Sequence, residues 1–186
     1  MGFNFDDVVL VDSNDQVIGT CKKMEAHVNG LLHRAFSVFI FNDAGELLLQ
    51  QRAFGKYHSE GLWTNTCCSH PAPGESNAEA GKRRLMEEMA IQCELHPSFS
   101  FEYRASLDHS LIEHELDHVM YGYSNESPTL NPAEAKDYKW IGLKELKNAI
   151  ANQPELYTAW LKIILRDHYQ HIESFSRYES LSERNI

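Results

Sequence analysis

The pattern of apolar and polar positions predicts a chain that begins with two β-hairpins. Residues 8–12 and 16–19 flank a turn-rich segment and predict the first hairpin. The second signal is stronger, because apolar runs at residues 35–41 and 46–52 lie on either side of the turn sequence Asn-Asp-Ala-Gly. We therefore expect two buried strands joined by a tight turn.

A long irregular stretch follows at residues 53–74, rich in glycine, proline, serine and histidine. A loop of that length inside a compact domain is usually functional. Ser76 and Glu79 then have the spacing of a capping box, and the apolar residues after them recur at helical spacing. The sequence thus predicts a functional loop that leads into a helix at residues 77–89.

The remaining pattern alternates between strands and helices. It predicts strands at 99–105, 116–123 and 137–141, a loop at 125–132, a helix at 143–150, a longer helix at 155–171 and a polar, frayed tail at 174–186. No repeat, low-complexity tract or linker interrupts it. We expect residues 1–186 to form a single α+β or α/β/α domain with a mixed sheet.

Composition and charge exclude several classes of function. The 186 residues are 42% hydrophobic and 24% charged, within the globular range, and carry a net charge of −10, which argues against nucleic acid or an anionic membrane as a partner. No apolar run is long enough to span a membrane, and the acidic N-terminal segment is unlike a signal peptide. Free thiols in a reducing compartment fit the four cysteines, since adjacent Cys67 and Cys68 are poor partners for each other. We expect a cytoplasmic protein.

The string His114-Glu-Leu-Asp-His118 matches the H-E-x-x-H motif of zinc proteases. That chemistry requires a helix, because only a helix brings histidines at i and i+4 to one face. The β-prone residues that follow favour a strand instead. A strand directs Glu113, Glu115 and Asp117 to one face, where two carboxylates can enter one site as oxygen ligands.

Ten histidines in one chain give the composition of a metal site. In the segment Trp-Thr-Asn-Thr-Cys-Cys-Ser-His-Pro, an extended backbone places Cys68 and His70 on one side and Cys67 on the other, which suits proton transfer. The alternative is a buried cysteine pair that fills space. His27 and His33 precede a core strand and are compatible with ordinary loop residues. Surface positions are expected for five further histidines, namely His58, His96, His109, His168 and His171.

The helix at 77–89 carries Arg83, Arg84, Glu87 and Glu88 at ion-pair spacing. Surface ion pairs are one interpretation. However, arginine before glutamate is the weaker orientation, and two carboxylates late in a helix oppose its dipole. Binding of Mg²⁺ by these carboxylates is therefore a fair alternative.

Four separated motifs, at residues 30–42, 47–52, 63–71 and 113–117, together resemble type I isopentenyl diphosphate isomerase over most of the chain. Residues 74–90 also resemble a degenerate Nudix box. Arg83, Glu87 and Glu88 match that box, whereas Arg84 and Ala90 replace the glutamate and glycine of the hydrolases. The resemblance implies a Nudix-like α/β/α sandwich with a mixed sheet, and the missing glutamate argues against hydrolysis.

The resemblance implies interconversion of isopentenyl and dimethylallyl diphosphate in isoprenoid biosynthesis, by protonation and deprotonation through a carbocation-like state. It assigns Cys68 and Glu115 as the acid/base pair, Tyr103 as an assisting group and Trp160 as the indole that stabilises the cation. It also implies metal ligands and diphosphate-binding cations. One divalent metal, for which Zn²⁺ or Mn²⁺ suits the ligands, would be held by His27, His33, His70, Glu113 and Glu115. Glu88 would help place Mg²⁺ on the substrate diphosphate. The cations around that diphosphate would be Lys23, Arg52, Lys56 and Arg84.

Three other functions compete with this hypothesis. The nearest is a Nudix-type diphosphate hydrolase, which would share the fold and the Mg²⁺ helix. A non-catalytic isoprenoid-diphosphate binder and a zinc protease are the others. We expect a small-molecule substrate, no nucleic-acid or membrane partner, and a monomer or weak homodimer.

Overall fold

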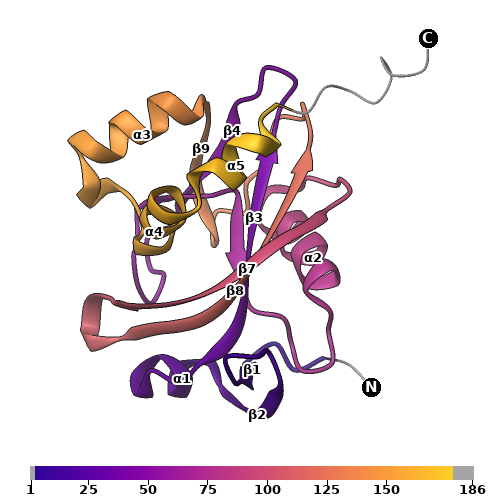
Figure 1. The fold of residues 1–186 in the computed structure, drawn as a ribbon, viewed down its shortest axis with the longest axis vertical. Coiled ribbons are helices and arrows are strands. Elements are labelled where there is room, and N and C mark those ends of the chain that lie inside the picture. Colours follow the sequence, from indigo (N-terminus) through magenta and orange to yellow (C-terminus); the bar gives the residue numbers. More distant parts are fainter. Residues whose placement is uncertain (1–2, 178–186) are drawn as a thin grey trace.

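The computed structural model describes residues 3–177, which form one mixed sheet covered by helices (Figure 1). The strands are β1 Asp7–Val11, β2 Val17–Lys22, β3 His33–Phe41, β4 Leu47–Arg52, β5 Trp63–Thr64, β6 Cys67–Ser69, β7 His96–Ser106, β8 Ile112–Tyr123 and β9 Ala135–Ile141. The helices are α1 Lys23–Asn29, α2 Asn77–Met89, α3 Leu143–Asn152, α4 Ala159–Asp167 and α5 Tyr169–Phe175, with short 3₁₀ turns at Asp108–Ser110 and Pro154–Leu156.

Strand β3 organises the sheet, because it pairs with four other strands. It runs antiparallel to β1, β4 and β6 and parallel to β8 over its whole length. Strand β7 pairs antiparallel with β8, and β9 pairs antiparallel with β4. The sheet is therefore mixed, as the sequence predicts.

Alternate residues of β3 enter two different cores. Val38 and Ile40 pack with Leu85 and Met89 of α2, whereas Phe39 and Phe41 pack with apolar side chains of α3, α4 and α5. Helix α2 accordingly lies on one side of the sheet and α3 to α5 lie on the other (Figure 1). This is the predicted α/β/α arrangement, and it follows from the period of two along a strand.

Four segments differ from the sequence prediction. Helix α1 is not predicted, since its seven residues carry no clear apolar stripe. Short strands β5 and β6 lie within the predicted irregular stretch. The predicted helix at 155–171 is divided by extended backbone at Thr158 and by His168, whose φ of −124° and ψ of 19° are not helical. Phe175 of α5 is buried in the core, so the predicted frayed tail does not begin at residue 174. The rest of the predicted tail, residues 178–186, lies outside the described part of the chain.

The four cysteines are free, as predicted. Within residues 3–177, no helix has the length and apolar character needed to cross a membrane.

Helix α2 begins at the predicted capping box. The backbone N–H of Glu79 donates to Ser76 Oγ at 3.3 Å, and the backbone N–H of Ser76 donates to Glu79 Oε2 at 3.0 Å. Two of the N–H groups at this helix end are thereby satisfied.

We predict that Ser76→Ala destabilises the protein by about 1 kcal/mol, because the Glu79 N–H loses its capping partner. Urea unfolding followed by circular dichroism measures this change. Ser98→Ala, at an exposed position in β7, is the control and should change the free energy of unfolding by no more than about 0.5 kcal/mol. Equal stabilities of the two variants would contradict the prediction.

Candidate active site

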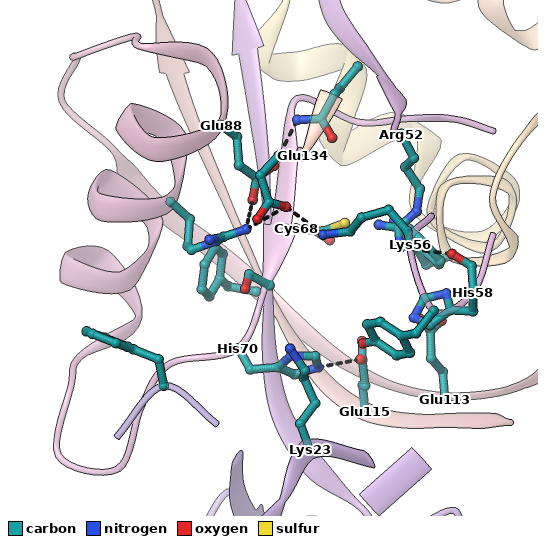
Figure 2. Close-up of a pocket in the computed structure, with 18 of the residues that line it drawn as sticks. Lys23, Arg52, Lys56, His58, Cys68, His70, Glu88, Glu113, Glu115 and Glu134 are labelled. Carbon is teal, nitrogen blue, oxygen red and sulfur yellow. Dashed lines mark hydrogen bonds and ion pairs between the residues drawn. The ribbon is translucent and has the colours of Figure 1, made fainter. Parts of the chain in front are cut away.

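A pocket opens where β3, β6, β7 and β8 meet the 52–59 loop, α2 and α4 (Figure 2). It gathers most of the site residues predicted from the sequence. Those that line it are Lys23, Arg52, Lys56, Cys68, His70, Arg84, Glu88, Tyr103, Glu113, Glu115 and Trp160. His27 and His33 are fully buried beside it.

The strand register determines which side chains meet in this pocket. His33 of β3 is opposite Glu115 of β8, and Tyr103 of β7 is opposite the same glutamate. Directly paired residues on neighbouring strands project to the same face of the sheet. Consequently three segments far apart in the sequence bring an imidazole, a carboxylate and a phenol together.

Two backbone carbonyls orient the histidines of the cluster. His27 Nδ1 lies 2.8 Å from the carbonyl of Lys23, and His33 Nδ1 lies 2.8 Å from that of Leu31. Since a carbonyl only accepts, each Nδ1 carries the proton and each Nε2 offers a lone pair. His27 Nε2 is buried with no hydrogen-bond partner in the described chain.

His70 and Glu115 complete a group that can hold a metal ion. His70 Nε2 lies 2.9 Å from Glu115 Oε1 and 3.2 Å from His33 Nε2. One ligand atom from each of His27, His33, His70 and Glu115 lies within 4.8 Å of the others. Carbonyl-anchored imidazoles whose free nitrogens converge with a carboxylate are the donor set of a divalent metal site.

The fifth predicted ligand, Glu113, falls in a second group with His27 and His58. The surface position expected for His58 is wrong, because the side chain is only 4% exposed. Arg52 donates hydrogen bonds to the carbonyls of His58 and Ser59 and so folds this loop into the pocket. The other four histidines without a motif are exposed or half-buried.

The two buried glutamates have opposite electrostatic environments. Burial and the charge of Glu115 raise the pKa of Glu113. Burial also opposes ionisation of Glu115, but the neighbouring imidazoles of His33 and His70 outweigh it and lower the pKa. The Tyr103 hydroxyl lies 2.7 Å from Glu115 Oε2 and 3.0 Å from Glu113 Oε2, so it connects the two groups.

Cys68 and Cys67 project to opposite sides of β6, as predicted. Cys67 is fully buried in the core beneath α2, whereas Cys68 lines the pocket. Burial raises the pKa of the Cys68 thiol, although the nearby charge of Arg52 opposes the shift. The thiol is therefore protonated near neutral pH and is able to donate a proton.

Two of the predicted cations, Lys56 and Arg84, pair with Glu134 and Glu88, which lie across the pocket from Glu113 and Glu115 (Figure 2). Lys56 Nζ lies 2.5 Å from Glu134 Oε2, and Arg84 Nη2 lies 3.0 Å from the same oxygen and 2.7 Å from Glu88 Oε1. Burial, followed by the charges of Lys56 and Arg84, lowers the pKa of Lys23. Arg84 and Glu88 thus form the predicted ion pair, and their side chains also face the pocket.

Trp160 of α4 is buried, and Asn65 fixes it over the pocket. The indole Nε1–H donates to Asn65 Oδ1 at 3.2 Å, while Asn65 Nδ2 donates to the carbonyls of Val38 and Cys67 at 3.2 and 2.9 Å. The Arg52 guanidinium carbon lies 5.3 Å from the indole centroid. Asn65 therefore connects α4 to both β3 and β6.

The zinc-protease hypothesis is wrong, because residues 112–123 form strand β8. His114 faces away from the pocket, where its Nδ1 lies 3.0 Å from the Gly30 carbonyl and its Nε2 lies 3.1 Å from Glu102 Oε1. The alternation of side chains along a strand separates His114 from Glu113 and Glu115, as the strand interpretation predicts.

Three residues of the site were not predicted from the sequence: His58 and Glu134, which line the pocket, and Asn65, which holds Trp160 in place. Asn65 lies inside the motif at residues 63–71. Its place in that motif was the available signal. His58 and Glu134 have no local pattern, because loop folding and contacts distant in sequence bring them to the pocket.

Comparison with known proteins agrees with this architecture and defines the class. A family model described as NUDIX domain matches residues 31–161. A crystal structure of a Deinococcus radiodurans protein has a TM-score of 0.69 at 19% identity, covering 86% of this chain and 98% of that one. A MutT protein from Methanosarcina mazei has a TM-score of 0.60 at 21% identity, covering 79% and 96%. These structures share the fold.

Sequence relatives define the family within that class. "Isopentenyl-diphosphate Delta-isomerase 2" of Aromatoleum aromaticum is 52% identical over 86% of this chain and 85% of its own length. "Isopentenyl-diphosphate Delta-isomerase" of Pectobacterium atrosepticum is 50% identical over 90% of this chain and 96% of its own. The chain belongs to the isopentenyl-diphosphate Delta-isomerase family of Nudix-domain proteins.

We predict that Asn65→Ala lowers the free energy of unfolding by about 2 to 4 kcal/mol, because it leaves two buried carbonyls and the Trp160 N–H without partners. Urea unfolding measures the loss. Asn14→Ala, in an exposed turn, is the matched control with a small expected effect. A loss below about 1 kcal/mol would show that Asn65 does not connect α4 to the sheet.

Proposed function

We propose that this protein interconverts isopentenyl diphosphate and dimethylallyl diphosphate. The observation that carries the proposal is that the Cys68 thiol lines the same pocket as Glu115 (Figure 2), which accepts a hydrogen bond from Tyr103, and as the indole of Trp160. Moving an unactivated double bond requires an acid, a base and a site that excludes water.

The reaction needs one proton gained and one lost. One group protonates the terminal CH₂ of the alkene, which generates positive charge at the tertiary carbon, and another group removes a proton from the neighbouring CH₂ to form the new double bond. Cys68 and Glu115 are the proposed pair, and Tyr103, hydrogen-bonded to Glu115, assists transfer. The electron-rich face of Trp160 stabilises the cationic state between the two steps.

The cationic end of the pocket fits a diphosphate. Lys23, Arg52, Lys56 and Arg84 are the proposed ligands of its oxygens, and Glu88 would help hold Mg²⁺ bound to the same group. Arginine and lysine near a phosphate form charge-assisted hydrogen bonds. This local charge accounts for binding an anion in a protein whose net charge is −10.

A divalent metal fits the His27, His33, His70, Glu113 and Glu115 cluster, and we propose Zn²⁺ or Mn²⁺ from the nitrogen-rich donor set. When bound, the ion neutralises the buried carboxylates and polarises groups attached to it. The imidazoles hold Glu115 in a fixed orientation towards the pocket, which keeps its second oxygen on Tyr103.

The Nudix-type hydrolase is the weaker alternative. Arg84, not a glutamate, follows Arg83 in the box-like segment, and its guanidinium pairs with Glu88 and Glu134. A cation at that position supplies neither a metal ligand nor a general base. We also propose a cytoplasmic location, which the four free cysteines support, and a monomer or weak homodimer that binds neither nucleic acid nor membranes.

We expect proton NMR of reduced protein with isopentenyl diphosphate and Mg²⁺ in deuterated water to reveal dimethylallyl diphosphate carrying deuterium. Cys68→Ser should abolish the product, because an alkanol is a far weaker acid than a thiol. Cys21→Ser, a half-buried thiol at a sheet edge, is the control with full turnover. Released phosphate would support the hydrolase instead, and affinity without turnover would support the non-catalytic binder.

We predict that Trp160→Phe lowers kcat about fivefold and leaves KM nearly unchanged. A phenyl ring stabilises a cation by roughly 1 kcal/mol less than an indole, and only the charged intermediate state benefits from that interaction. Steady-state kinetics measures both constants. Trp140→Phe, whose side chain packs beneath α2, is the control; an equal effect of both substitutions would remove the assigned role of Trp160.

A further inference from the structure

His58 is a buried histidine with no assigned role, and its Nε2 points towards a buried carboxylate. Its Nε2 lies 3.6 Å from Glu113 Oε1, and its Nδ1 lies 3.2 Å from the Ser59 hydroxyl. Ser59 has a φ of 51° and donates its backbone N–H to Asp108 Oδ2 at 2.9 Å. A non-glycine residue held in this left-handed conformation marks a loop whose path is constrained around the site.

The group that contains His58 shares one residue with the other candidate metal-binding group. His27 belongs both to the group with His33, His70 and Glu115 and to the group with His58 and Glu113. The ring centroids of His27 and His58 are 5.8 Å apart and their planes differ by 25°. The two groups therefore adjoin at His27.

His27 can bind a single ion. Its Nδ1 proton is engaged by the Lys23 carbonyl, so that Nε2, which has no other partner in the described residues, offers the one lone pair available. An imidazole nitrogen has one lone pair and ligates one metal ion. Two ions, one in each group, cannot both use His27.

We propose that the two groups are halves of one divalent-ion site in which His58 is a sixth ligand. The ion would be held by four imidazoles and two carboxylates, from His27, His33, His58, His70, Glu113 and Glu115. Six nitrogen and oxygen donors satisfy an octahedral ion. The proposal rests on the metal site of the proposed function, and it explains why the loop that carries His58 is folded inward.

Packing is the competing role for His58. Its ring lies edge-on to Trp160 with centroids 5.9 Å apart and planes at 87°. A packing role needs an aromatic ring and no nitrogen. His58→Phe retains a ring against Trp160 and removes both nitrogens, whereas His58→Asn retains a polar group near the Nδ1 position and removes Nε2.

The test uses metal binding by the full chain without substrate. A chelator first removes bound metal. The affinity and stoichiometry of Zn²⁺ binding are then measured against a chromophoric competitor. X-ray absorption spectroscopy of the zinc-loaded protein gives the number of imidazole ligands. His33→Asn tests the site itself. His114→Asn, which removes an imidazole from the outer face of β8, is the matched control, and near-ultraviolet circular dichroism checks folding.

We expect the unmodified protein to bind one Zn²⁺ per chain through four imidazole ligands. Both His58 variants should bind Zn²⁺ about tenfold or more weakly and through three imidazole ligands. His114→Asn should bind as the unmodified protein does. Unchanged affinity and imidazole number in His58→Phe, with clear loss in His33→Asn, would overturn the assignment of His58 alone. Two ions per chain would overturn the single site, and an unaffected His33→Asn would overturn the proposed metal site as a whole.

Discussion

The parallel pairing of β3 with β8 is the constraint on which the site depends. It sets His33 beside Glu115, and the antiparallel pairing of β7 with β8 sets Tyr103 beside the same residue. A shift of one residue in either register would turn the carboxylate to the opposite face, because side chains alternate along a strand. The apolar residues of β3 prevent such a shift, since they enter different cores on the two faces of the sheet.

Buried charge is the cost of this arrangement, and the surrounding groups offset it. Two carboxylates at i and i+2 in a buried strand repel each other and lose hydration. Tyr103 connects their inner oxygens, and imidazoles face their outer ones. The histidines of this cluster lie in α1 (His27), at the start of β3 (His33), directly after β6 (His70) and in the 52–59 loop (His58).

Features encoded locally were predictable, and those that depend on distant contacts were not. Helix α2 follows from its capping box and apolar period, and the common face of Glu113 and Glu115 follows from alternation along β8. The protease-like string failed as a motif because its meaning depends on a helix. His58 and Glu134 could not be predicted, because Arg52 folds one into the pocket and Lys56 and Arg84 contact the other only in the folded chain.

Glu134 illustrates how a cationic pocket is kept stable before an anion binds. Like charges on Lys56 and Arg84 would repel each other in a partly desolvated site. Burial opposes ionisation of Glu134, but the hydrogen bond from Lys56 and the charge of Arg84 outweigh it and lower the pKa, so the carboxylate stays charged between them. Both cations are therefore held in place near the pocket, so the diphosphate of the proposed substrate would meet donors that are already oriented, which reduces the entropy lost on binding.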